Sequence, residues 1–145
     1  MFRNILFVCV GNICRSPTAE ALMRHRLGRD DIAVASAGLQ ALVGRPIDAT
    51  AGLLLREHGL DADAHRARQA TASLLTGADL VLVMERRHLL DIGRDVPQAS
   101  GKVFLLGKWR DGREIPDPYR QQRPAFEHAY RQIEDCVASW TPYLR

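Results

Sequence analysis

Four short apolar runs, separated by stretches with helical patterning, constrain the fold of this chain more than any other feature of its sequence. The runs cover residues 4–8, 32–36, 79–84 and 102–106. Three of them are rich in Val, Ile or Phe, and nearly continuous apolar character is typical of strands buried on both faces. Strands that alternate with helices form a parallel sheet covered by helices on both sides. We therefore predict an α/β fold, with a single domain over residues 1–145.

The segments that follow these runs carry apolar residues at helical spacing. Ser16 is a favourable N-cap and Pro17 a favourable first residue for the first helix. Gly59 is suited to end the second helix. The loop over residues 108–124 is long for a connection without secondary structure, and such loops are usually functional or mobile. The predicted helices cover residues 17–27, 48–58, 70–76, 86–92 and 124–140.

Charge and hydropathy exclude two classes of protein. The chain contains 18 Arg and 2 Lys, but these alternate with acidic residues and the net charge is only +3, so we do not expect nucleic-acid binding. The longest apolar runs are far short of the ~20 residues that span a membrane, so no membrane insertion is expected. The N-terminal segment has no small-residue cleavage site. We expect a cytoplasmic protein whose thiols are reduced.

The sequence CVGNICRS, residues 9–16, lies between the first predicted strand and the first predicted helix. Ligands of open α/β sheets bind beyond the carboxyl ends of the strands, where Cys9 is placed. Gly11 and Asn12 tolerate positive φ, so the loop can point successive backbone N–H groups inward. The N-terminus of the helix and the guanidinium of Arg15 add positive charge. This arrangement predicts a small oxyanion bound directly above the sulfur of Cys9.

The same positive field stabilises a thiolate. A thiolate beneath a bound phosphate predicts in-line attack on phosphorus and a phosphocysteine intermediate. Ser16 can donate a hydrogen bond to the sulfur and help it leave. The spacing C-x5-R is by itself a weak motif in a chain so rich in arginine, and the alternative is a core cysteine beside a surface charge. The strand before the loop and the Ser-Pro and helix after it favour catalysis.

The stretch VCVGNICRSPTAEA, residues 8–21, resembles the signature of the low-molecular-weight protein tyrosine phosphatases, C-x5-R-S between the first strand and the first helix. The resemblance spans the chain. Among the members of the family, the chain most resembles bacterial enzymes that act on the tyrosine kinases of capsule and exopolysaccharide export. Further motifs in the family's order are SAG at 36–38, HRARQ at 65–69, ADLVLVME at 78–85 and IPDPYR at 115–120.

The resemblance implies a phosphatase-I, flavodoxin-like sheet of four parallel strands in the order 2-1-3-4, and a protein-tyrosine-phosphatase activity. It implies that Cys9 is the nucleophile, that Arg15 binds phosphate and that Asp117 is the general acid; on spacing alone, Glu85 and Glu114 are weaker candidates for the acid. Substrate binding is expected at Val10, Gly11, Asn12, Ile13, Cys14 and Ser16.

Two residues are expected to wall the slot for the substrate ring. Tyr119 lies two residues after Asp117, and Leu42 follows the second strand, where relatives often carry an aromatic residue. Many relatives also carry a second aromatic residue where this chain has Arg120, which weakens any comparison with the aryl substrates of eukaryotic members.

Supporting and redox roles also follow from the resemblance. Ser36 and His65 are expected to hydrogen-bond Asn12 and hold its left-handed conformation. We expect Cys14 to be a resolving thiol that captures oxidised Cys9 as a disulfide. No cofactor is expected and no metal, because two cysteines five residues apart in a phosphate loop leave no ligand quartet.

Three other functions fit the sequence less well than a phosphatase does. An arsenate reductase of the same fold relays a disulfide through further cysteines, but Cys136 is the only cysteine outside the loop. A carrier phosphorylated on cysteine needs neither Arg15 nor a general acid. A non-catalytic phosphate-binding module has no need to combine Cys9, Arg15 and Asp117. We therefore favour the phosphatase, with inorganic phosphate as product and a phosphotyrosine protein, such as the tail of a membrane-anchored bacterial tyrosine kinase, as substrate.

Overall fold

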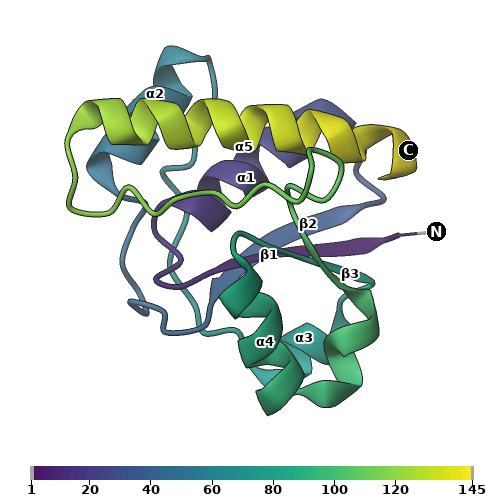
Figure 1. Cartoon of the computed structure of the whole chain (residues 1–145). Coiled ribbons are helices and arrows are strands. Elements are labelled where there is room, and N and C mark those ends of the chain that lie inside the picture. The colour runs from purple at the N-terminus through teal and green to yellow at the C-terminus, as the bar shows by residue number, and fades with distance from the viewer. Residues whose placement is uncertain (1, 145) are drawn as a thin grey trace.

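A four-stranded parallel sheet forms the centre of the protein (Figure 1). The computed structural model describes residues 2–144. The strands are arranged in the order β2-β1-β3-β4, which confirms the predicted α/β class and topology. The strands are β1 (Asn4–Cys9), β2 (Ala33–Gly38), β3 (Leu80–Val83) and β4 (Val103–Leu105).

Helices cover both faces of this sheet. In Figure 1, α1, α2 and α5 lie on one side of it and α3 and α4 on the other. A short 3-10 helix, η1, which the sequence did not predict, leads into β4. The helices are α1 (Arg15–Leu27), α2 (Ala49–Glu57), α3 (Ala72–Gly77), α4 (Arg86–Asp95), η1 (Pro97–Lys102) and α5 (Arg123–Leu144).

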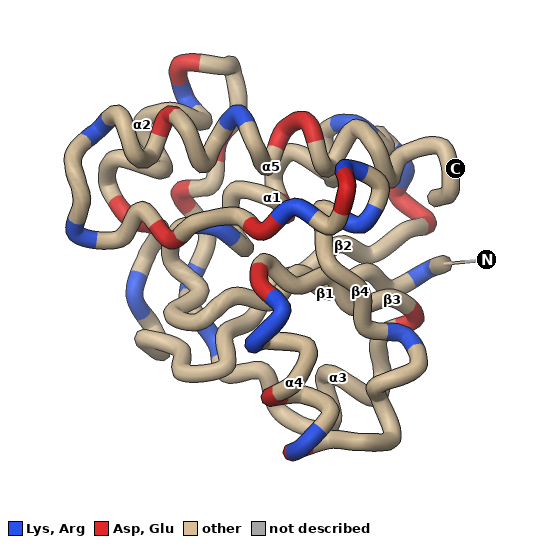
Figure 2. Tube along the Cα trace, in the orientation of Figure 1, with Lys and Arg blue, Asp and Glu red and all other residues tan. Residues whose placement is uncertain are grey.

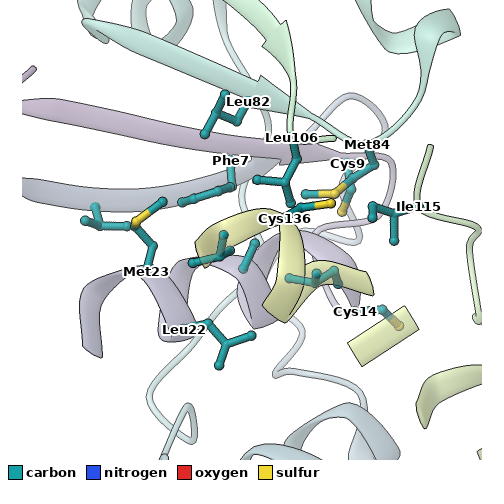
Figure 3. Packing of buried hydrophobic residues seen from close by; sticks show 14 of the residues in the cluster. Phe7, Cys9, Cys14, Leu22, Met23, Leu82, Met84, Leu106, Ile115 and Cys136 are labelled. Atoms are coloured by element: carbon teal, nitrogen blue, oxygen red, sulfur yellow. The ribbon is translucent and has the colours of Figure 1, made fainter. Parts of the chain in front are cut away.

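The alternating side chains of β1 divide the interior into two cores. Phe7 and Cys9 point into the larger core with α1, α2 and α5, and Figure 3 shows the packing around them. Leu6 and Val8 point into the smaller core with α3, α4 and η1. Successive residues of a strand face opposite sides, so a nearly continuous apolar run is what a strand between two helix layers requires.

Several predicted helix boundaries are wrong, among them the end of α4, which lies at Asp95 rather than at residue 92. Ser16 is not the N-cap of α1: the helix begins at Arg15, Cys14 occupies the cap position, and no side chain caps the helix. The hydroxyl of Ser16 is used in the site described below, which explains why it does not cap. Helix α5 continues past its predicted end to Leu144, with Pro142 inside its last turns. Gly59 does turn the chain after α2, with φ at 78°.

The connection pattern places a crevice at the end of β1. The chain leaves β1 for β2 on one side, whereas β3 pairs with β1 on the other, and ligands of open α/β sheets bind at such a switch point. Figure 2 shows Lys and Arg alternating with Asp and Glu along the chain, with no broad face of one sign in this view. No helix within residues 2–144 has the length and apolar character needed to cross a membrane.

Candidate active site

The loop of residues 9–15, here called the anion loop, is held by a left-handed residue at its centre. Asn12 has φ at 60° and is completely buried. Its side-chain Nδ2 donates to Ser36 Oγ at 3.0 Å and to Ser16 Oγ at 2.8 Å. Its Oδ1 accepts from the backbone N–H of Arg68 at 2.9 Å, and its carbonyl oxygen lies 2.7 Å from Nε2 of His65. These bonds offset the strain of a left-handed residue, of order 1 kcal/mol or more.

A second set of contacts fixes the groups that hold Asn12. Ser36 Oγ donates to Glu20 Oε1 at 2.6 Å, so its lone pairs face the Asn12 amide. The guanidinium of Arg68 donates to the carbonyl oxygen of Ser36. At the end of β2, a Cβ on Gly38 would lie 2.3 Å from the carbonyl oxygen of Val10. Only glycine therefore allows the backbone of the anion loop to pack this closely against the end of β2. Ser36 was expected from the resemblance, whereas Glu20 and Arg68 were not.

Cys9 lies at the bottom of the loop with its sulfur against a hydroxyl. The Sγ atom is 2.9 Å from Ser16 Oγ, and the Cys9 residue is buried. Because Ser16 Oγ already accepts from Asn12 Nδ2, its own proton is free to be donated to the sulfur. Hydrogen bonds that run in one direction polarise each other. The chain from Asn12 through Ser16 therefore directs an O–H donor at the sulfur of Cys9.

Arg15 is held by a carboxylate and a carbonyl oxygen of the protein itself. It is only 2% exposed, and its Nη1 donates to Glu85 Oε2 at 2.6 Å and to the carbonyl oxygen of Ile115 at 2.8 Å. Burial acts to raise the pKa of Glu85, but the hydrogen bond and charge of Arg15 outweigh it and hold that pKa below its ordinary value. From the sequence, Glu85 is only a weak candidate acid, although its place between the end of β3 and the start of α4 marks the binding edge of the sheet.

His88 lies behind Glu85 and is 1% exposed. The backbone N–H of Glu85 donates to His88 Nδ1 at 3.2 Å, so the other ring nitrogen carries the proton of the neutral imidazole. That nitrogen, Nε2, lies 3.6 Å from Glu85 Oε2 and has no hydrogen-bond partner within residues 2–144. Burial, reinforced by the positive charge of Arg15, lowers the pKa of His88 to about 4.

Asp117 reaches the same place from the loop before α5. Its Oδ2 lies 3.6 Å from Arg15 Nη2, while its Oδ1 accepts from the backbone N–H of Tyr119 at 3.0 Å. Gln121 donates through Nε2 to the carbonyl oxygen of Asp117 and braces the loop. The Asp117 side chain remains 39% exposed, so it stands at the mouth of the site and can exchange protons with water.

These groups surround one pocket of about 140 Å³. Leu42 and Tyr119, the two predicted wall residues, both line this pocket, and so does Ile13. Gln40, which the sequence reasoning missed, also lines it and belongs to the loop that leaves the carboxyl end of β2. Ser16, Ser36 and His65 lie behind the pocket and act on its lining residues. The lining residues are Cys9, Val10, Gly11, Asn12, Ile13, Cys14, Arg15, Gln40, Leu42, Asp117 and Tyr119.

Cys14 is buried between this pocket and the packing of α5. It also lines a small cavity that Phe126 and Tyr130 of α5 close, and Figure 3 shows its side chain apart from Cys9. Burial, and next the carboxylate of Asp48, hold the pKa of Cys14 far above its ordinary value. Cys14 is therefore a neutral thiol at the pH at which the site works, and the two sulfurs are not bonded to each other.

Comparison with known proteins places this site in a family. Residues 4–145 match the model of the low molecular weight phosphotyrosine protein phosphatases. The low molecular weight protein-tyrosine-phosphatase Wzb of Salmonella typhimurium is 46% identical over 144 residues, which cover 99% of this chain and 95% of that protein. The structure of Vibrio vulnificus Wzb in complex with benzylphosphonate superposes with a TM-score of 0.94 at 42% identity, covering 99% of each chain.

A more distant relative shows what else the fold accommodates. The YwlE arginine phosphatase from Geobacillus stearothermophilus superposes with a TM-score of 0.91 at 32% identity, covering 99% of this chain and 93% of that one. The family model and the identity to Wzb nevertheless extend over almost the whole chain. The chain belongs to the low molecular weight phosphotyrosine protein phosphatase family and is a protein-tyrosine phosphatase.

Proposed function

We propose that this phosphatase hydrolyses phosphotyrosine through a phosphocysteine on Cys9, and that its substrate is a bacterial tyrosine kinase of capsule or exopolysaccharide export. The contact that carries the mechanism is the 2.9 Å approach of Ser16 Oγ to Cys9 Sγ at the base of the anion loop. This contact gives the anionic sulfur a hydrogen-bond donor. It leaves the side of the sulfur that faces the pocket free to attack phosphorus.

In the first step the Cys9 thiolate attacks phosphorus. A sulfur–phosphorus bond forms while the bond from phosphorus to the tyrosine oxygen breaks, and protonated Asp117 gives its proton to the departing oxygen. The planar guanidinium of Arg15 is suited to bind two of the phosphoryl oxygens, and the backbone N–H groups of the loop supply further donors. Because Glu85 already holds Arg15, little ordering remains when substrate binds.

In the second step water attacks the phosphocysteine. Asp117, now a carboxylate, takes a proton from that water, an oxygen–phosphorus bond forms, and the bond to sulfur breaks. The Cys9 thiolate leaves with the hydroxyl of Ser16 hydrogen-bonded to it, and inorganic phosphate is released. Asp117 thus acts as acid and then as base, which its position at the exposed mouth of the pocket allows.

The pocket walls favour a flat ring. Ile13, Leu42 and Tyr119 are apolar or aromatic and line the space above the anion loop. The ring of phosphotyrosine can stack in such a slot, whereas the shorter side chain of phosphoserine would not carry its phosphorus down to Cys9. The kinase substrate is supported by the likeness to bacterial enzymes of the Wzb type.

The test compares phosphotyrosine, phosphoserine and phosphoarginine in one peptide sequence. We expect phosphotyrosine to be cleaved with a kcat/KM at least ~100-fold above either of the others, and rapid quenching to trap a phosphoenzyme that is absent from Cys9→Ser. Cleavage of phosphoserine or phosphoarginine at a comparable rate would contradict the slot. Substantial turnover by Cys9→Ser would contradict the covalent mechanism.

The kinase substrate needs its own measurement. Cys9→Ser, immobilised and incubated with lysate from a strain producing exopolysaccharide, should retain a tyrosine-phosphorylated kinase, and vanadate should release it. Wild-type enzyme should remove phosphate from the purified kinase. Failure of both reactions would show that the substrate is another phosphoprotein.

A further inference from the structure

The turn of residues 118–121, directly after Asp117, contains a residue that its backbone geometry does not favour. The backbone N–H of Gln121 donates to the carbonyl oxygen of Pro118 at 2.9 Å, and Arg120 between them has φ at 64°. This is the pattern of a type II turn, whose third position normally carries Gly or Asn because other residues are strained at positive φ. The backbone conformation at this position disfavours a long charged side chain. Its presence there indicates that the side chain has a function.

The side chain of Arg120 lies against the wall of the pocket. Its guanidinium carbon is 5.2 Å from the centroid of the Tyr119 ring, and the residue is exposed. Tyr119 lines the pocket but Arg120 does not, so the positive charge lies outside the slot and next to its wall. A cation–π contact of this kind leaves the N–H donors at the rim of the guanidinium free.

Arg120 also differs from its neighbours in having no acidic partner. It takes part in none of the ion pairs formed among residues 2–144. Arg123, three residues later, pairs with Glu57 at 2.7 Å and with Glu127 at 3.4 Å. A cation that is placed at the mouth of a site and left unpaired is available to a ligand.

We propose that Arg120 determines substrate specificity by binding an acidic side chain that flanks the phosphotyrosine. This proposal rests on the phosphotyrosine specificity proposed above. With the ring of the substrate in the slot beside Tyr119, the chain that leaves the slot must pass the mouth where Arg120 stands. A carboxylate there can accept two parallel hydrogen bonds from the guanidinium.

The carboxyl group of Asp117 does not cancel the attraction between Arg120 and an acidic side chain of the substrate. Asp117 precedes Arg120 by three residues, and in the proposed mechanism it is protonated when substrate binds. The phosphate of the substrate is paired with Arg15 at the bottom of the pocket, so Arg120 is left to the flanking residue.

The experiment measures kcat/KM for a set of phosphotyrosine peptides at low ionic strength. One peptide has alanine on both sides, and four others each carry a single Glu, two or one residues before or after the phosphotyrosine. We expect at least one position to raise kcat/KM by about two- to fivefold, the effect of one exposed ion pair, and the gain to shrink as salt is added. Each Glu peptide has a Gln counterpart as its control.

Three variants locate the effect. Arg120→Asn suits the turn and removes the charge, so the preference for Glu over Gln should disappear. Arg120→Lys keeps the charge but loses the planar fork, so part of the preference should remain. Arg3→Asn removes the same charge before β1, at the opposite edge of the sheet from the anion loop, and should keep the full preference. Thermal unfolding of each variant verifies that it is folded.

The outcomes separate this inference from the proposed function. If wild-type enzyme cleaves the alanine-flanked peptide but shows no preference for Glu at any position, the role of Arg120 is wrong and the phosphotyrosine activity stands. A preference that survives in Arg120→Asn also overturns the role of Arg120. If no phosphotyrosine peptide is cleaved, the proposed function itself fails.

Discussion

Arg15 Nη1 and Glu85 Oε2 lie 2.6 Å apart, so a carboxylate of the protein itself orients the arginine of the anion loop. Arg15 is almost completely buried, and a buried guanidinium without a partner is unfavourable. Cys9 lies at the end of β1 and Glu85 lies beyond the end of the neighbouring strand β3. Arg15 thus connects the anion loop to the end of β3.

Removal of Glu85 should damage both binding and stability. In Glu85→Ala the guanidinium loses its charged partner and its fixed direction, so we expect kcat/KM to fall by about 10- to 100-fold and the free energy of unfolding to fall by about 1–3 kcal/mol. Glu85→Gln keeps an oxygen acceptor and should lose less in both measurements. Steady-state kinetics and urea unfolding check the prediction, which is wrong if Glu85→Ala matches the wild type in both.

His88 should make the protein less stable as the pH falls from about 6.5 to 4. The unfolded chain takes up a proton on this residue near its ordinary pKa of 6.5, whereas the folded protein does so only at about 4. In this window the unfolded state binds more protons, so the free energy of unfolding declines with falling pH, by about 3 kcal/mol in total. Above pH 6.5 the effect is absent.

The measurement is a series of urea unfolding curves between pH 4 and 8 for wild type and His88→Asn. The asparagine can still accept from the backbone N–H of Glu85 but cannot take up a proton. Because other groups titrate in the same range, the difference between the two proteins is the relevant quantity. A difference that does not change with pH would show that His88 titrates normally in the folded state.

Asp117→Asn should slow substrates in proportion to how much their leaving group needs a proton. Phenyl phosphate, whose phenolate is a poor leaving group, should lose about 10²–10⁴-fold in kcat/KM, which reports the step in which the leaving group departs, and 4-nitrophenyl phosphate much less. The fall of kcat/KM on the basic side of the pH profile should also flatten. A leaving-group series at constant pH provides the check, and equal slowing of all members would remove Asp117 from the role of acid.

The fold could be predicted from the sequence because the spacing of apolar residues in each strand and helix indicates which of its faces are buried. The run at β1 is apolar at successive positions, and the structure buries it between two cores. The error at Ser16 has a physical reason: a serine before a proline is a good cap, but its hydroxyl is used between Asn12 and Cys9. The tendency of serine to cap a helix is outweighed here by hydrogen bonds of its hydroxyl to Cys9 and Asn12.

The site was predictable where its residues are contiguous and much less so elsewhere. The anion loop combines strand, turn residues and helix in a single stretch, so its chemistry could be argued from the sequence. Asp117, Ser36 and His65 came only from the resemblance, since each is an ordinary polar residue in its own segment. The partnership of Arg15 with Glu85 was missed because it joins residues 70 positions apart, and only the sheet order brings them together.

The last prediction concerns Cys14 as a resolving thiol. Peroxide should oxidise the Cys9 thiolate to a sulfenic acid, and the thiol of Cys14 should then attack that sulfur, forming a disulfide and releasing water. Because burial and Asp48 keep Cys14 protonated, this second step should be slow at neutral pH and become faster as the pH rises. Cys14 lines both the active-site pocket and the small cavity closed by α5, so it borders the pocket that holds Cys9.

Two variants test the two halves of this mechanism. Cys14→Ser should remain active but lose the recovery that thiol reductants give after peroxide, because its Cys9 proceeds to sulfinic acid. Asp48→Asn retains a side chain that can cap α2 and removes the nearby negative charge, so its disulfide should form faster than in the wild type. Mass spectrometry of the oxidised wild type should show the link between Cys9 and Cys14. If it shows sulfinic or sulfonic Cys9 beside reduced Cys14, the thiol does not resolve the oxidised nucleophile.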